Sequence, residues 1–148
     1  MLSSMQTQTH NLEKFQAAAA KFSAELTPLS NRATVVGLYG ELGSGKTTFV
    51  QAVAKAFGVS ERVTSPTFLI LKSYKLTTNS YKLLVHVDVY RLRSSTELAR
   101  LRFDELLSDP HNLILVEWAD KVADLLPKDH FKLHFGFVDE NTRKITID

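Results

Sequence analysis

The stretch that decides the fold reads GELGSGKT from Gly40 to Thr47, and it matches the pattern G-x-x-x-x-G-K-[ST]. An apolar, β-rich run at 33–39 comes directly before it, and apolar residues recur at helical spacing from about 46 to 57 after it. Strand, glycine-rich turn and helix in this order predict a phosphate-binding loop. At average composition the pattern arises at on the order of a few in a hundred thousand positions, so chance does not account for it.

Each residue type in the loop has a chemical reason. The glycines permit positive φ angles and a close approach of the backbone to phosphates. Successive N–H groups form an anion-binding nest, and the helix beginning near Lys46 adds its positive end. Lys46 brings a positive charge to the β- and γ-phosphates, while the Thr47 hydroxyl can bind Mg²⁺. The expected nucleotide-binding residues are Gly40, Leu42, Gly43, Ser44, Gly45, Lys46, Thr47 and Thr48.

The bound nucleotide is expected to be ATP with Mg²⁺. GTPases read guanine with an Asn-Lys-x-Asp segment, and the chain contains none. Such a site also needs an acid at the end of a neighbouring strand, to hold Mg²⁺ or to direct the attacking water. Glu117 follows four apolar residues and Asp88 ends a similar run, so both are candidates. The alternative is that each carboxylate marks where its strand reaches solvent.

Other polar residues near these strands allow more than one interpretation. Pro66 favours an extended Ser65, which would place the Thr67 hydroxyl at a strand start facing the γ-phosphate; an ordinary turn is the alternative. Trp118, the single tryptophan, is either a core residue or part of a substrate or partner surface. His86 alternates with valines and is expected to be packed or hydrogen-bonded rather than a metal ligand.

The remaining pattern predicts a three-layer α/β domain around a mixed parallel and antiparallel sheet. Further elements are expected as a helix from 12 to 26, a hairpin of 68–75 with 81–90, a helix from 96 to 107, a strand at 112–118 and a hairpin of 131–138 with 143–147. Gly58 is expected just past the end of the helix that follows the loop. The 148 residues are expected to form one domain.

Composition excludes several classes of protein. The chain has no cysteine, so it carries neither disulfides nor thiolate metal sites. A net charge of +2 is too small to indicate a nucleic-acid surface by itself. No apolar run spans a membrane, and residues 1–10 are interpreted as a frayed, disordered end, so a cytoplasmic protein is expected. The basic cluster of Arg91, Arg93, Arg100 and Arg102 is mostly expected to be a solvated helix face.

Four segments together resemble one family. They read GELGSGKTTF at 40–49, SPTF at 65–68, HVDVYRL at 86–92 and VEWA at 116–119, in the order and at the approximate spacing of the bacterial tRNA threonylcarbamoyladenosine biosynthesis ATPase TsaE, once called YjeE. The resemblance is firm from about 33 to 118. The chain departs from the family at Arg102, where the family usually has glycine, and in a longer first helix and loop.

The resemblance implies a small ATPase acting in formation of N6-threonylcarbamoyladenosine at position 37 of tRNA. It implies binding to the TsaD–TsaB pair, which carries the transferase site, with tRNA reached indirectly through that complex. If the family's residue roles hold at the matching positions, Lys46 contacts phosphate, Thr47 and Glu117 hold Mg²⁺, and Asp88 serves catalysis. Thr67 is then the switch-like residue and Trp118 part of the functional surface. Hydrolysis is expected to be slow without the partner, because positioning and charge neutralisation dominate phosphoryl transfer.

Two other functions suit the same loop. A small nucleotide or metabolite kinase also carries it, and the arginine cluster would then act as a phosphate-clamping lid. Against that interpretation, 148 residues leave little room for an acceptor pocket and a lid. A nucleotide-gated binding module with negligible hydrolysis is the other possibility. For the ATPase itself, Arg91 is the one arginine considered for the γ-phosphate.

Overall fold

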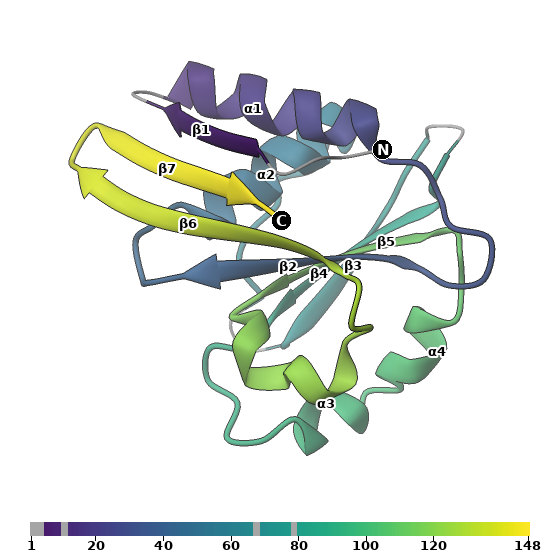
Figure 1. The fold of residues 1–148 in the computed structure, drawn as a ribbon. Helices are drawn as coiled ribbons and strands as arrows, with labels where there is room; N and C mark the ends of the chain where they lie inside the picture. The colour runs from purple at the N-terminus through teal and green to yellow at the C-terminus, as the bar shows by residue number, and fades with distance from the viewer. Residues whose placement is uncertain (1–4, 10–11, 67–68, 78–79) are drawn as a thin grey trace.

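The protein folds around a seven-stranded mixed sheet, seen edge-on in Figure 1. The computed structural model describes residues 5–9, 12–66, 69–77 and 80–148. The strands are β1 (Met5–Thr9), β2 (Thr34–Gly40), β3 (Leu71–Lys75), β4 (Leu83–Asp88), β5 (Asn112–Glu117), β6 (Phe131–Asp139) and β7 (Thr142–Ile147). The helices are α1 (Leu12–Glu25), α2 (Lys46–Ala56), α3 (Thr96–Ala99), α4 (Phe103–Leu107) and the 3₁₀ helix η1 (Ala119–Leu125).

The strand order is β1-β7-β6-β2-β5-β4-β3. Strand β2 pairs in parallel with β5 and with β6, and β5 pairs in parallel with β4. The β1–β7, β6–β7 and β3–β4 pairs are antiparallel. The predicted mixed sheet is therefore confirmed. Because β2, β5 and β4 are parallel neighbours, their carboxyl ends meet at one edge of the sheet, where ligands bind in open α/β sheets.

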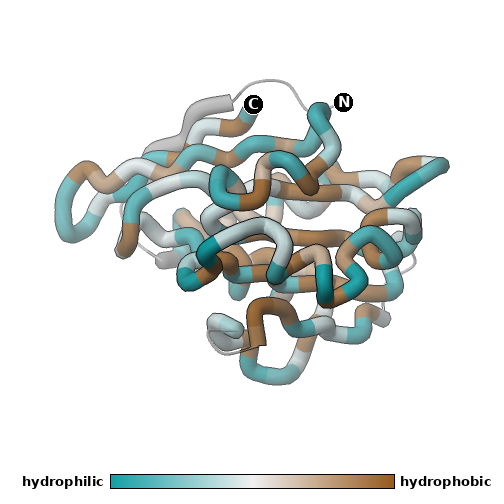
Figure 2. Tube along the Cα trace, turned by 90° about the horizontal axis from the view of Figure 1, so that it is seen from below, coloured by the Kyte–Doolittle hydropathy of each residue, from teal (hydrophilic) through white to brown (hydrophobic). Residues whose placement is uncertain are grey.

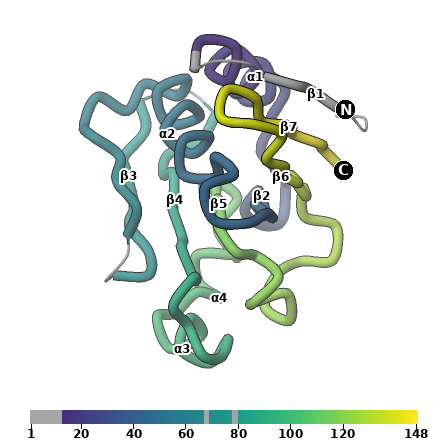
Figure 3. Tube along the Cα trace, turned by 90° about the vertical axis from the view of Figure 1, so that its left-hand side faces the viewer, coloured from purple at the N-terminus to yellow at the C-terminus, as the bar shows by residue number. Residues whose placement is uncertain are grey.

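Helices cover both faces of the sheet, as the views in Figures 1 and 3 agree. Alternate residues of each central strand enter two different cores. On β5, Leu113 and Leu115 join the core beneath α1 and α2, whereas Ile114 and Val116 join the core beneath α3, α4 and η1. Figure 2 shows hydrophobic residues along the inner strands and hydrophilic residues in the turns. This arrangement is the predicted three-layer architecture.

Helix α2 ends as its sequence predicts. Gly58 has φ 84°, its N–H donates to the Lys55 carbonyl, and the Val59 N–H donates to the Ala54 carbonyl. This pair of bonds is the Schellman motif, in which a left-handed residue satisfies the last helical carbonyls. Within the described residues, no helix combines the length and apolar composition that crossing a bilayer requires.

Two expectations are corrected by the structure. The N-terminal segment 1–10 is not frayed throughout, because residues 5–9 form β1 and pair with the edge strand β7. The helix expected from 96 to 107 is broken into α3 and α4 at Arg102, which has φ 61° and ψ 40°. Leu98 and Phe103 are both buried, yet five residues of α-helix would point them roughly 140° apart. The break allows both side chains to face the sheet.

Candidate functional site

The loop between β2 and α2 has the backbone that its glycines predict. Gly40 has φ 151° and Gly45 has φ 105°. A Cβ atom on Gly40 would lie 2.6 Å from the Phe135 carbonyl oxygen of β6, and one on Gly45 would lie 3.1 Å from the Phe15 ring. At Gly40 a side chain would clash with the backbone of β6, whereas at Gly45 it would press on the Phe15 ring, and the positive φ favours glycine at both positions. The loop is thus held close to β6 and α1 as well as to its own strand and helix.

Lys46 begins α2 and turns back over the loop. Its Nζ donates to the carbonyls of Gly40 at 2.5 Å and Glu41 at 2.9 Å, and it lies 4.0 Å from the centre of the Trp118 ring. Burial lowers the pKa of Lys46, and the nearby Glu117 and Asp88 carboxylates oppose that shift. The ammonium is therefore poorly solvated, so an anion entering the loop would gain a strong charge-assisted contact.

Thr47, Glu117 and His86 form one hydrogen-bonded chain. The Thr47 hydroxyl donates to the two Glu117 carboxylate oxygens at 2.8 and 3.0 Å. His86 Nε2 lies 2.6 Å from Glu117 Oε2, and both of these side chains are almost fully buried. The three residues come from α2, β5 and β4. His86 is hydrogen-bonded, as predicted, and its partner is the predicted metal-side acid.

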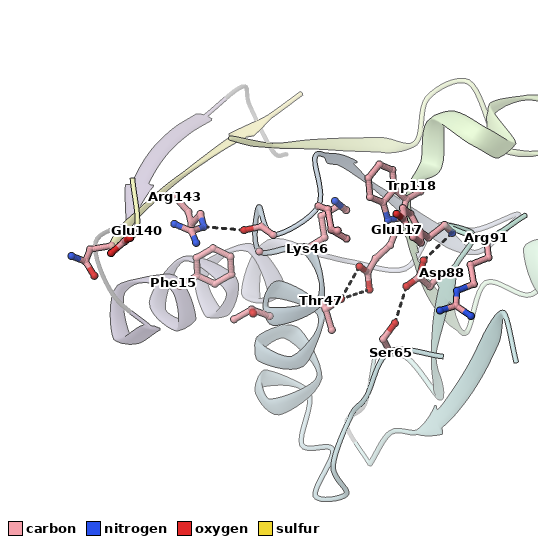
Figure 4. Close-up of a pocket in the computed structure, with 16 residues that line it drawn as sticks. Phe15, Lys46, Thr47, Ser65, Asp88, Arg91, Glu117, Trp118, Glu140 and Arg143 are labelled. Carbon is pink, nitrogen blue, oxygen red and sulfur yellow. Dashed lines mark hydrogen bonds between the residues drawn. The ribbon is translucent and has the colours of Figure 1, made fainter. Parts of the chain in front are cut away.

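Asp88 lies beside this chain at the end of β4. The strand register places it directly opposite Glu117. Its Oδ2 accepts a hydrogen bond from the Ser65 hydroxyl at 2.8 Å, and its Oδ1 accepts one from the Tyr90 N–H at 3.0 Å. Two separate contacts therefore orient this half-buried carboxylate toward the same edge of the sheet as Glu117, as Figure 4 shows.

A cavity of about 670 Å³ joins these groups, a volume in the usual range for small-molecule sites. Figure 4 shows Lys46 and Thr47 near its middle, Glu117, Asp88, Ser65 and Arg91 on one side, and Phe15, Glu140 and Arg143 on the other. The lining residues are Phe15, Leu42, Gly43, Gly45, Lys46, Thr47, Thr48, Ser65, Asp88, Tyr90, Arg91, Glu117, Trp118, Glu140, Asn141 and Arg143.

The donor set suits Mg²⁺ carried by a phosphate. Thr47 supplies a hydroxyl and Glu117 a carboxylate within 3.0 Å of each other, and Mg²⁺ prefers oxygen ligands. Among the described residues, no three His, Asp or Glu side chains gather as a metal cage. An ion held by one or two protein oxygens, with water and phosphates completing its shell, fits this arrangement.

The structure brings together most of the residues that sequence reasoning selected. Leu42, Gly43, Gly45, Lys46, Thr47 and Thr48 line the cavity with Asp88, Glu117 and Trp118. Gly40 and Ser44 shape the loop without lining it. The Thr67 prediction lies outside the described residues. All four arginines of the basic cluster are exposed, and Arg91 also reaches the cavity.

Sequence reasoning missed the far wall of the cavity. Phe15 comes from α1, and Glu140, Asn141 and Arg143 come from the β6–β7 hairpin. Arg143 Nε donates to the Gly43 carbonyl at 3.2 Å, across 100 residues of sequence. No short motif signals such a contact, because it depends on the pairing of β6 with β2.

The chain is similar to proteins of known name. Residues 9–145 match the family described as "Threonylcarbamoyl adenosine biosynthesis protein TsaE". The relative in Rickettsia bellii, named tRNA threonylcarbamoyladenosine biosynthesis protein TsaE, is 35% identical over 143 residues, 96% of this chain and 93% of that protein. A protein of the same name in Rickettsia felis is 39% identical over 114 residues, which cover 76% of this chain but 64% of that relative.

A solved structure supports the fold independently. The crystal structure of YdiB from Bacillus subtilis matches with a TM-score of 0.77 and 30% identity, over 99% of this chain and 86% of that chain. The predicted α/β, P-loop NTPase-like fold is therefore confirmed.

Proposed function

This chain belongs to the TsaE family of threonylcarbamoyl adenosine biosynthesis proteins, and on that premise we propose that it is a P-loop ATPase required for N6-threonylcarbamoyladenosine modification of tRNA at position 37. The observation that carries the proposal is the Thr47–Glu117 pair beside the phosphate loop. A hydroxyl and a buried carboxylate meet there, next to Lys46 and opposite Asp88. Action on tRNA implies a cytoplasmic location.

Each residue of the site has a task in phosphoryl transfer. The loop N–H groups and Lys46 hold the phosphates, and Thr47 with Glu117 holds Mg²⁺. The ion, when bound, neutralises charge that develops on the phosphate oxygens. Asp88 is the acid positioned to orient the attacking water, since Ser65 and the Tyr90 N–H fix its carboxylate. Arg91 lines the same side of the cavity and is the candidate for further charge neutralisation.

The ATPase acts through a protein partner in this proposal. That partner is the TsaD–TsaB pair, and tRNA is reached through the complex because the net charge of +2 supplies little attraction of its own. Tyr90 and Trp118 both line the cavity, their rings lie 4.9 Å apart, and Tyr90 is 43% exposed. A partner packing on these rings would order the side of the cavity that holds Asp88. If ATP tightens partner binding, the partner must tighten ATP binding equally.

The test is to measure ATP hydrolysis by the chain alone and with purified TsaD–TsaB, and to measure partner binding with and without Mg-ATP. We expect slow hydrolysis alone, faster hydrolysis with the pair, and tighter partner binding with nucleotide. Lys46→Ala should abolish the nucleotide effect, while Lys55→Ala, an exposed lysine on the same helix, should preserve it. Equal rates and nucleotide-independent binding would refute the coupling. ATP consumption that requires an added small-molecule acceptor would indicate a kinase instead.

A further inference from the structure

His86 lies behind the cavity, and the proposed function gives it no task. Its side chain is fully buried and does not line the cavity. We propose that His86 is a positioning residue for Glu117: its Nε2–H holds one carboxylate oxygen, so that the other oxygen faces the Mg²⁺ carried by the nucleotide. The inference rests on the proposed nucleotide site and adds a residue that acts on the metal through another side chain.

The pleat of β4 brings His86 into an apolar layer. Val85 and Val87 enter the core beneath α3, α4 and η1, whereas Leu84 enters the core beneath α1 and α2. His86 shares the face of Leu84, because side chains alternate along a strand. A polar side chain in such a layer destabilises the fold unless it is hydrogen-bonded. Among the described residues its one hydrogen-bond partner is Glu117, so this contact sets the orientation of the imidazole.

The surroundings of the imidazole determine which nitrogen donates. His86 Nε2 lies 2.6 Å from Glu117 Oε2. A metal-binding carboxylate is ionised and only accepts hydrogen bonds, so Nε2 carries the hydrogen. Nδ1 is then a lone-pair acceptor, buried without a partner among the described residues. A hydrogen on Nδ1 instead would bury an unpaired donor and set two acceptors against each other, which costs more.

Glu117 is held from two sides, and the two holds are unequal. The Thr47 hydroxyl approaches from α2 and donates to Oε1 at 2.8 Å and to Oε2 at 3.0 Å, as Figure 4 shows. His86 approaches from β4 and donates to Oε2 alone. Within the described part of the chain, Oε1 has no partner besides the single shared hydrogen of Thr47. Oε1 is therefore the oxygen with lone pairs left for a cation.

His86 also holds Glu117 against the repulsion of the neighbouring acid. Asp88 and Glu117 are register partners on adjacent parallel strands, so their carboxylates lie on the same face of the sheet. Like charges at such a separation repel each other. Asp88 is fixed by donors of its own, the Ser65 hydroxyl and the Tyr90 N–H. Without His86, the Glu117 carboxylate would be free to turn, and its metal-facing oxygen would no longer be set.

The experiment replaces His86 with two amides of different reach. Glutamine carries its amide nitrogen about as far from the backbone as Nε2, whereas asparagine reaches only as far as Nδ1. ATP binding is titrated by calorimetry at a series of Mg²⁺ concentrations and in EDTA. His86→Asn should raise the half-saturating Mg²⁺ concentration about 10- to 100-fold, the usual effect of removing the partner that orients a metal ligand. His86→Gln should restore it to within about threefold of the wild type, and neither should weaken ATP binding in EDTA.

The matched control for lost packing is Leu84→Ala. Leu84 lies two residues before His86 on the same buried face and does not line the cavity. Its removal should lower Tm and leave the Mg²⁺ dependence unchanged. Equal shifts in the asparagine and glutamine variants, a shift in Leu84→Ala, or no shift in His86→Asn would each overturn the positioning role. Wild-type protein that binds ATP equally in Mg²⁺ and EDTA would instead refute the metal site of the proposed function.

A second measurement needs neither ligand nor an unstable variant. Nitrogen chemical shifts of the His86 imidazole report which ring nitrogen carries hydrogen in the wild-type chain, and His86→Gln identifies the signal. We expect a protonated Nε2. A neutral ring with its hydrogen on Nδ1 could not donate to Glu117, and that result would overturn the proposal.

Discussion

Replacing Glu117 with glutamine separates a metal-binding role of this residue from its structural role. In the folded protein its carboxylate accepts hydrogen bonds from Thr47 and His86 while only 2% exposed. Glutamine keeps the volume and one carbonyl oxygen. Its amide group can donate to the Thr47 hydroxyl, which is able to rotate and accept. The substitution therefore removes the charge and leaves the packing in place.

The loss of stability expected for Glu117→Gln is small enough that the variant should stay folded and its Mg²⁺ binding can be measured. A hydrogen bond to a charged group contributes about 1.5–3 kcal/mol and a neutral one about 0.5–1.5 kcal/mol, so the expected loss is roughly 1 kcal/mol for each of the two partners. The total of about 2 kcal/mol corresponds to about 4–8 °C in Tm. Glu117→Ala is a poorer test. It leaves a cavity and strips the remaining partner from His86, whose Nδ1 already has none among the described residues. That variant should lose at least about 3 kcal/mol.

The assay is a calorimetric titration of ATP at a series of Mg²⁺ concentrations, with an EDTA series as the reference. Residues that only orient the ligands of a metal typically contribute 10- to 100-fold to its affinity, and a residue that holds the ion should contribute at least as much. Glu117→Gln should therefore raise the Mg²⁺ concentration needed for half-maximal binding by about that factor. It should not weaken Mg²⁺-free binding, because the lost carboxylate charge repels phosphate. A variant with the wild-type Mg²⁺ dependence would refute the metal-side role. If Asp88→Asn shows the shift instead, the two acids have exchanged roles.

Four further substitutions test other parts of the structure. Lys46→Ala should lose about 1.5–3 kcal/mol of Mg-ATP affinity in a titration, and unchanged affinity would refute the phosphate loop. Asp88→Asn should bind Mg-ATP nearly as the wild type does but slow single-turnover hydrolysis by about 10²–10⁴, and an undiminished rate would remove it from catalysis. Arg102→Gly should be more stable than Arg102→Ala by about 1 kcal/mol, or about 2–4 °C in Tm, because φ at this position is 61° and glycine adopts positive φ without strain. Equal Tm values for the two variants would show that the left-handed backbone at this position carries no such cost. Burial lowers the pKa of His130 below 6.5, so the unfolded chain takes up a proton before the folded protein does as the pH falls, and stability declines. In thermal melts from pH 7.5 to 5.5, the Tm of His130→Gln should therefore decline less steeply than that of the wild type. Parallel declines would show that His130 does not cause the loss of stability.

The local features of this protein could be predicted from the sequence because short-range chemistry determines them. Glycine, lysine and threonine at fixed spacing specify the phosphate loop, and Gly58 specifies the helix end by its positive φ. Apolar runs that end in Asp88 and Glu117 predicted that both carboxylates would lie at the edge of the sheet. The parallel pairing of β4 with β5 confirms that placement.

The predictions that the structure corrects concern segments whose conformation depends on distant parts of the chain. The pattern of 96–107 is helical, yet burying both Leu98 and Phe103 required a left-handed break that local preference disfavours. Strand β1 exists because β7 offered an unpaired edge, which nothing in the polar segment itself indicates.

The candidate site shows most clearly the difference between features that follow from local sequence and features that follow from tertiary structure. Sequence alone selected the residues that we propose for phosphate and metal chemistry, because those functions need particular side chains at particular spacings. Only the tertiary structure decided that His86 holds Glu117 and that Arg143 reaches Gly43, across separations of 31 and 100 residues. Strand order and register set these contacts, and they depend on packing two cores against opposite faces of one sheet. That packing is a property of the whole chain, so no local segment encodes it.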